Sequence, residues 1–476
     1  MSTQSAPKLK KVISYRSYIS LGLGIIIGVG WVVYSGTWLQ DGGPLGAIIA
    51  FLLGGLCLIP VGKAYGELTS AMPVAGGELA FSFKAYGPLI AFLTGWSLAL
   101  SYVTLAPFET IAIGGLFEVT FPSLKTEALY YIGDDHVALS TLIPGLGIGA
   151  YLTWLNIQGT KKSTQFQSIM ISLLLACTLV FTSVAFFKGE ISNLTPLFAS
   201  EGNFWAVAPA SIISVIVVVP WFMSGFDAIP QAAEEAGVKI QPNQLGKAIV
   251  ATITGGTIFY VIIILAVSIT QPWQQTAELP WATAEVFKVA LGFEWAAQIV
   301  LIAALMGLIS TLNGMMIAAS RLLFAMGRGG LLPHWFGVIG KKHHAPKNAV
   351  LFVGLFSLVG PFIGKAALGP IVNSSSLTFT TVLFITCVGA IHLRKKAPEM
   401  ERPFKTSLPT LYFGALVSLI LCLLMILPQS AGQLASHEFI IIILWVLLGY
   451  FAYLWRQKSS DISVEEQENY ILGKYK

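Results

Sequence analysis

Long apolar runs separated by short polar connections repeat along the whole 476-residue chain, and they limit the folds open to it. Each run is close to the roughly 20 residues that an α-helix needs to cross a bilayer. Hydrophobic residues make up 55% of the chain and charged residues 11%, whereas soluble domains are about 45–50% apolar and about 25% charged. We therefore expect an all-α membrane protein. Its twelve predicted transmembrane helices span residues 16–38, 44–66, 88–118, 138–158, 165–187, 206–231, 246–270, 294–326, 347–364, 371–392, 408–428 and 438–456.

The basic residues predict the orientation of these helices, because cytoplasmic connections carry an excess of Lys and Arg. All but four of the 28 Lys and Arg lie in the tails and even-numbered connections, the exceptions being Lys125, Lys188, Lys288 and Lys365. We expect a multi-pass protein of the cell (inner) membrane, held in the lipid bilayer, with both termini cytoplasmic. The net charge of +5 follows from the same bias, so it does not indicate a nucleic-acid partner.

Outside the spans, the polar segments are too short for a soluble domain. Residues 64–87 and 326–346 each predict an interfacial helix, and the polar tail after Trp455 is expected to be loosely ordered. The four cysteines fall inside predicted spans without the spacing of a disulfide or metal site, so we expect free thiols and no metal.

Two carboxylates fall at bilayer depth. Glu109 interrupts the otherwise uncharged run Pro88–Phe117, and Asp227 interrupts Phe204–Ala233. A charge there costs at least about 2.5–3.5 kcal/mol, so it normally faces a water-filled cavity or a partner. We expect no buried Lys or Arg as that partner, which favours a cationic substrate, an ion or a proton. The alternatives are a carboxylate near the external surface for Glu109 and a structural, hydrogen-bonded carboxylate for Asp227.

Spans 1 and 6 contain an unusual number of helix-breaking residues. Such residues free backbone groups that protein, water or a ligand must satisfy, and paired interrupted helices indicate a transporter binding site. The alternative is that the glycines only allow close helix packing. The residues are Gly22, Gly24, Gly28 and Gly30 in span 1, and Pro220, Ser224, Gly225 and Pro230 in span 6.

Four sequence blocks, in order, cover most of the chain. They are Gly24 to Trp31; Glu67-Leu68 with Met72-Pro73, Ala75–Glu78 and Tyr86-Gly87; Phe222 to Glu235; and Ala319–Arg321 with Ala325-Met326, Arg328, Leu332-Pro333, Pro346, Leu393-Arg394, Pro398-Glu399 and Arg402–Phe404. With these blocks the chain resembles the amino acid–polyamine–organocation superfamily of secondary transporters.

The resemblance implies the fold of the sodium–leucine symporters, in which two five-helix inverted repeats carry discontinuous helices 1 and 6. A transport core would cover residues 16–392 and two peripheral helices residues 393–456, between cytoplasmic tails at 1–15 and 457–476.

The resemblance also implies the substrate site. In this superfamily the unwound first helix offers backbone amides to a substrate carboxylate, which here places Ile27, Gly28, Val29 and Gly30 at the site. Many relatives have Ser where this chain has Val29, so one hydroxyl donor is absent.

In the sixth helix, the break at Ser224, Gly225, Phe226 and Asp227 would attract an ammonium group. Trp221 resembles the aromatic gate over the substrate, unless it is a packing or lipid-facing ring. Glu109 matches a third-helix position that lines the pocket in relatives with cationic substrates.

The coupling ion stays open between a proton and sodium. Proton-driven relatives often hold a lysine in the fifth helix, and Phe166–Leu179 has none. Ser310 and Thr311, with carbonyls of Gly24 and Ile27, could form a sodium site of hard oxygen ligands. The hydroxyls could instead bond to their own helix. Alternatively, Glu109 or Asp227 carries a proton.

We predict a secondary active transporter, a symporter or antiporter that works by alternating access on cationic amino acids, polyamines or small amines. It would be a permease rather than an enzyme, without a cofactor, and a monomer or homodimer. The alternatives are a neutral amino-acid permease or exchanger and, from other classes, a channel or membrane receptor.

Overall fold

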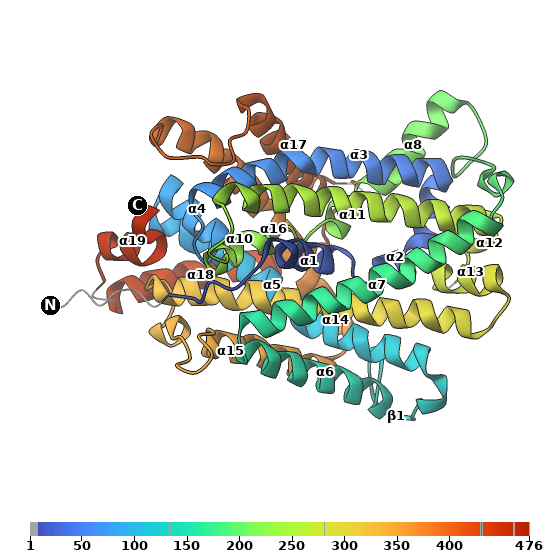
Figure 1. Ribbon diagram of the computed structural model, residues 1–476, viewed down its shortest axis with the longest axis horizontal. Coiled ribbons are helices and arrows are strands. Elements are labelled where there is room, and N and C mark those ends of the chain that lie inside the picture. Colours follow the sequence, from blue (N-terminus) through green and yellow to red (C-terminus); the bar gives the residue numbers. More distant parts are fainter. Residues whose placement is uncertain are drawn as a thin grey trace.

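The computed structural model describes residues 8–133, 135–279, 281–428, 430, 432–459 and 462–475, and most of them are helical (Figure 1). The elements up to residue 188 are α1 (Tyr15–Ile26), α2 (Gly30–Val33), α3 (Ser35–Ala71), α4 (Gly77–Tyr86), α5 (Pro88–Thr120), β1 (Ala128–Ile132), β2 (Asp135–Ala138), α6 (Leu139–Ile157) and α7 (Thr160–Lys188).

The second part of the chain is also built of helices. These are α8 (Phe204–Ile216), α9 (Val219–Phe222), α10 (Ala228–Gln231), α11 (Pro242–Thr270), α12 (Trp273–Ala277), α13 (Ala282–Leu291), α14 (Trp295–Arg328), α15 (Lys347–Ile363), α16 (Lys365–Lys396), α17 (Leu408–Ile426), α18 (Ser436–Ser459) and α19 (Val464–Leu472). Short 3-10 turns occur at Pro122–Leu124, Ile191–Leu194, Ala233–Glu235, His334–Gly337 and Gly473–Tyr475.

Within the described residues, ten helical segments are long and apolar enough to cross a membrane, as a multi-pass membrane protein requires. The predicted spans at 138–158 and 347–364 are helical too, as α6 and α15, but neither is among the ten. The chain therefore contains a helix at every predicted span, while the count of twelve crossings stays a prediction.

The structure differs from the prediction at the start of α3 and after α5. α3 begins at Ser35, before the predicted start at residue 44, and Gly43 (φ 64°, ψ 172°) kinks it. Only a residue without a Cβ adopts that backbone readily, so the first turns of α3 form a separate piece. The all-α expectation also missed a short antiparallel hairpin, β1–β2, which pairs Tyr131 with His136.

The predicted interfacial helices and the loose tail need correction. Residues 64–71 continue α3, and only α4 forms a separate helix in 64–87. Residues 329–346 contain one 3-10 turn and no α-helix, because α14 runs on to Arg328. The C-terminal tail folds into α19, whose Ile471 and Leu472 are buried against the bundle.

The extension of α14 also moves Arg328 out of the predicted loop, and Arg321 lies in the same helix. Arg321 is fully buried, and its Nε bonds to Glu235 Oε2 at 2.8 Å. Arg328 pairs in the same way with Glu234. Buried arginines therefore exist, contrary to the sequence expectation, but their carboxylate partners follow α10 and are not Glu109 or Asp227.

The bundle is organised around α1. α1 packs against α7, α11 and α14, while α3 packs on α11 and α5 on α14 (Figure 1). Because α1 is surrounded by long helices, a break in it opens into the interior of the bundle rather than toward lipid.

Candidate functional site

The first predicted span is interrupted inside the bundle. α1 ends at Ile26 and α2 begins at Gly30, so Ile27 to Val29 are not helical. Tyr260 from α11 donates its hydroxyl to the Ile26 carbonyl at 2.9 Å, and Thr283 from α13 donates to the Trp31 carbonyl at 2.7 Å. Side chains of the surrounding helices thus satisfy carbonyls that the interruption frees, as a break in a membrane helix requires.

The sixth predicted span is interrupted as well, and its break lies against the first. Between α9 and α10, residues 223–227 form turns, and Gly225 has φ 136°. A Cβ at Gly225 would lie 2.7 Å from the Ile25 Cβ and 3.1 Å from the Gly22 carbonyl oxygen. Glycine is therefore required here both by its backbone conformation and by the close approach of α1.

A cavity of about 770 Å³ begins at these two breaks and extends to the β1–β2 hairpin. Most of its wall is apolar, including Phe108, Leu308 and Met315. Among its described lining residues, Glu109 is the one carboxylate. A mostly apolar cavity with a few polar groups is the usual form of a small-molecule site.

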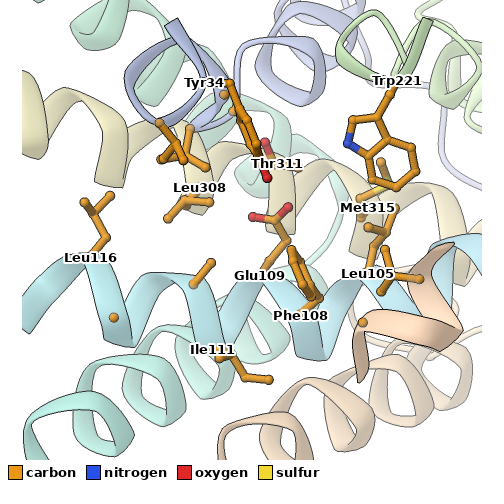
Figure 2. Close-up of a pocket in the computed structure, with 18 of the residues that line it drawn as sticks. Tyr34, Leu105, Phe108, Glu109, Ile111, Leu116, Trp221, Leu308, Thr311 and Met315 are labelled. Atoms are coloured by element: carbon orange, nitrogen blue, oxygen red, sulfur yellow. The ribbon is translucent and has the colours of Figure 1, made fainter. Parts of the chain in front are cut away.

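Glu109 is the polar group that stands out in this wall. It lies on α5, only 9% exposed, and its Oε2 has no hydrogen-bond partner among the described residues. Figure 2 shows its carboxylate pointing from α5 into the space bounded by Tyr34, Thr311, Trp221 and Met315. A buried carboxylate without a partner is unfavourable, so the cavity is suited to a ligand that brings a cation or a donor.

The structure brings together six of the ten predicted substrate residues. The ones that line the cavity are Gly28, Val29, Gly30, Glu109, Trp221 and Ser224. Trp221 is 43% exposed and stands at the edge of the cavity in Figure 2. Its place is compatible with the predicted gate, which stays a prediction.

The other four predicted residues, Ile27, Gly225, Phe226 and Asp227, do not line the cavity. Asp227 is fully buried and turned toward α5. Its Oδ2 accepts a hydrogen bond from Tyr102, and its Oδ1 accepts one from the Gly225 amide at 2.9 Å. Asp227 thus holds the break together, which is the structural alternative considered from the sequence.

The predicted ion site is only partly assembled. Thr311 Oγ1 lies 3.3 Å from the Gly24 carbonyl oxygen and 3.4 Å from that of Ile25, where Ile27 was expected. It also lies 3.1 Å from the Gly307 carbonyl of its own helix. Ser310 Oγ accepts a hydrogen bond from Gln167 instead, at 2.9 Å. The carbonyls around Thr311 are hard oxygen ligands, but whether they bind an ion stays a prediction.

Sequence reasoning missed several residues of this region. Tyr34, Phe222 and Tyr260 line the cavity with aromatic rings; no motif marked Tyr34 or Tyr260, and Phe222 began a sequence block without being predicted at the site. Gln167 is fully buried between α1 and α14, within the stretch searched for a lysine. A Cβ at Gly24 would lie 2.3 Å from Gln167 Nε2, so a neutral amide packs directly on α1.

A multi-pass helical bundle with a small-molecule cavity at two broken helices is the architecture of a membrane transporter. Residues 13–451 match the amino acid permease family, so the chain belongs to that family and to the amino acid–polyamine–organocation superfamily. It is a permease and not an enzyme, and its family implies a small-molecule amino acid as substrate.

Similar proteins differ in what they carry. The chain is 28% identical to a branched-chain amino acid permease of Bacillus subtilis, over 97% of this chain and 96% of that protein. It is 27% identical to a methylthioribose transporter of the same organism, with the same coverage. A chloroplastic cationic amino acid transporter of Arabidopsis thaliana is 24% identical over 92% of this chain and 74% of its own length.

Proposed function

We propose that this permease is a secondary active transporter of small amines or amino acids, and that Glu109 binds a positively charged group of the substrate. The buried, unpartnered Oε2 of Glu109 in the cavity carries the proposal. An ammonium group would supply the missing donors and neutralise the carboxylate in one step. The cationic amino acid transporter among the similar proteins supports this substrate class.

The charge of the cavity favours one ammonium group over several. Glu109 is the one carboxylate among the described lining residues, and the nearby walls are apolar. A polyamine would place its second ammonium group against apolar atoms, which is costly without a partner. Within the proposed class, we therefore favour substrates with one cationic group and an apolar body over polyamines.

A substrate carboxylate has a place at the first break. No backbone hydrogen bond to another described residue engages the amides of Gly28, Val29 and Gly30. Free amides attract anions, so these three groups are suited to bind a carboxylate. An amino acid would then lie between the amides of the first break and Glu109.

A neutral amino acid is the second candidate, because the cavity wall is largely apolar. The branched-chain permease among the similar proteins supports this alternative. In that case Glu109 would bind the α-ammonium group, which every amino acid carries, and the apolar wall would select the side chain.

Alternating access requires two mobile bundles, and the helix packing supports this part of the proposal. α3 packs on α11 and α5 on α14, which pairs the second predicted span with the seventh and the third with the eighth. Such pairs are the corresponding members of two five-helix inverted repeats, as proposed for a twelve-helix fold. With both termini cytoplasmic, the β1–β2 hairpin is external and the cavity faces outward.

The experiment is radiolabelled uptake into proteoliposomes, with arginine, leucine, a monoamine and putrescine as substrates. Glu109→Gln should weaken arginine or monoamine uptake at least tenfold, and Glu285→Gln, a surface carboxylate on α13, is the matched control. Equal leucine uptake by the Glu109→Gln variant and the unmodified protein, without arginine or amine uptake by either, would contradict the proposal. That result would indicate a neutral amino-acid permease in which Glu109 does not bind the substrate. Loss of leucine uptake in the Glu109→Gln variant would instead support the second candidate, in which Glu109 binds the α-ammonium group.

A further inference from the structure

A second cluster of buried polar groups lies apart from the cavity, where α3, α4, α5 and α10 meet. Its members are at most 1% exposed, and none of them lines the cavity. Figure 1 shows α4 next to α10, and the two helices are in contact. The members of this cluster are Tyr65, Glu78, Tyr102, Asp227 and Gln231.

Close backbone packing joins α4 to α10 at this cluster. A Cβ at Gly77 would lie 2.7 Å from the Pro230 Cβ and 3.2 Å from the Gln231 backbone nitrogen. One side-chain bond crosses the same contact, because Gln231 Nε2 donates to Glu78 Oε2 at 2.6 Å. Any movement of α10 away from α4 must therefore break the bond between Gln231 and Glu78.

The two carboxylates of the cluster are not equally satisfied. Asp227 accepts one hydrogen bond on each oxygen, from Tyr102 and from the Gly225 amide. Glu78 accepts one on Oε2, while its Oε1 is buried without a partner among the described residues. Donors to both oxygens stabilise an ionised carboxylate, whereas a bare buried oxygen disfavours one. The asymmetry leaves Asp227 as the anion and Glu78 as the group that needs a proton.

No cation balances this pair in the described part of the chain. The arginines near the same end of the bundle are already engaged, Arg321 by Glu235, Arg328 by Glu234 and Arg394 by Glu67. Two neighbouring carboxylates in a buried site do not both ionise without a partner.

The other titratable groups that act on Glu78 are Tyr65 from α3, Tyr102 from α5 and Asp227 at the start of α10. None of them brings a positive charge. Burial, and next the charge of Asp227, raises the pKa of Glu78 well above its usual value.

We propose that Glu78 is a proton-binding site, and that the proton it holds is the one coupled to transport. Glu78 binds the proton on Oε1 while α10 is docked on α4, and it releases the proton when α10 withdraws and water reaches the carboxyl group. The coupling rests on the proposed transport function, whereas proton binding by Glu78 does not. No lysine in the fifth helix is needed for this arrangement.

Infrared spectroscopy of the purified full-length protein tests proton binding without any transport. A protonated carboxyl group gives a C=O stretching band that an ionised carboxylate lacks. At neutral pH we expect a carboxylic band that Glu78→Gln removes and the surface control Glu285→Gln retains. A band that is unchanged in the Glu78→Gln variant overturns the proposal.

A second variant keeps the test decisive where Glu78→Gln fails to fold. Gln231→Leu removes the donor to Glu78 Oε2, which stabilises the ionised form. The pH midpoint of the Glu78 band should therefore rise. A fall, or an unchanged midpoint, contradicts the assignment to Glu78.

Proteoliposomes test the coupling. An acid-outside gradient should drive uphill accumulation by the unmodified protein, and Glu78→Gln should lower this accumulation at least tenfold while retaining substrate exchange. Accumulation by the Glu78→Gln variant at the unmodified level, or accumulation driven by sodium alone, overturns the proposal. Where the unmodified protein neither transports nor binds any substrate tested, the proposed function fails, and the infrared band still decides the proton site.

Discussion

Arg328 and Glu234 face each other through two parallel hydrogen bonds, from Nη1 to Oε1 at 2.9 Å and from Nη2 to Oε2 at 2.8 Å. Glu234 also accepts bonds from the Leu9 and Ala75 amides, both at 3.1 Å. One carboxylate therefore joins the end of α14, the segment after α10, the segment before α1 and the connection before α4. This linkage lies at the end of the bundle away from the β1–β2 hairpin (Figure 1).

Glu234→Gln should destabilise the protein by up to about 3–5 kcal/mol, because it removes the carboxylate charge from a largely buried ion pair with Arg328. The measurement is thermal unfolding in detergent, compared with Glu285→Gln. Glu285 is part of a more exposed pair with Lys288, so the control should lose about 0–1 kcal/mol. Equal melting temperatures for the two variants would show that the pair of Glu234 with Arg328 stabilises the protein no more than an exposed ion pair does.

The same carboxylate predicts how stability depends on pH. Burial alone would raise the pKa of Glu234, but the charge and hydrogen bonds of Arg328, with the Leu9 and Ala75 amides, hold its pKa below the usual 4.5. A depressed pKa stabilises the fold above the unfolded-state value, and this stabilisation is lost as the pH falls through the folded pKa. Melting temperature should therefore drop below about pH 4.5, and Glu234→Gln should flatten that part of the profile.

Gly30→Ala should impair transport while the protein still folds. A Cβ at this position would lie 2.6 Å from Phe222 Cε1, so the added methyl pushes the first break away from the sixth. We expect uptake to fall at least tenfold and Gly30→Ala with Phe222→Leu to recover part of it. Gly147→Ala is the control, because nothing lies within 4 Å of a Cβ there. Equal uptake by both single variants would mean that the contact is not required.

The docking of α19 is open to a direct test. A Cβ at Gly329 would lie 2.6 Å from Ile471 Cγ1, so Ile471 packs closely on the end of α14. Ile471→Asp should release α19 and speed limited proteolysis after α18 at least tenfold. Asn469→Asp, on the exposed face of α19, should change nothing. Slow cleavage of both variants would show that other contacts hold α19.

The positions of the helices and of the two breaks could be predicted from the sequence. A long apolar run favours a membrane helix, and clustered Gly and Pro interrupt one, so both features depend on neighbouring residues only. It could not tell which side chains at the second break face the cavity. Ser224 lines the cavity, whereas Asp227 accepts a hydrogen bond from Tyr102. Both lie in a run of turns, where helical spacing does not predict which side chains point in the same direction. The direction of each side chain is set there by contacts with α1 and α5, which are far away in the sequence.

Glu78 shows a second limit of sequence reasoning. It lies in a segment that was expected at the membrane interface, where a carboxylate needs no explanation. It is buried where α4 packs against α5, α16 and α10, and the contact with α10 brings Gly77 close to Pro230. The burial of Glu78 could therefore not be predicted from the sequence, because it depends on contacts between segments that are far apart in the chain.

Val29→Ser should shift substrate preference toward amino acids. Val29 lines the cavity at the first break, beside the amides that we propose for a substrate carboxylate. An added hydroxyl would donate one more hydrogen bond to that carboxylate, worth about 0.5–1.5 kcal/mol, or roughly a twofold to tenfold gain in affinity. A monoamine, which has no carboxylate, should gain nothing and serves as the internal control. The measurement is competition of arginine and a monoamine for uptake in proteoliposomes. An equal change for both substrates would place the carboxylate away from Val29.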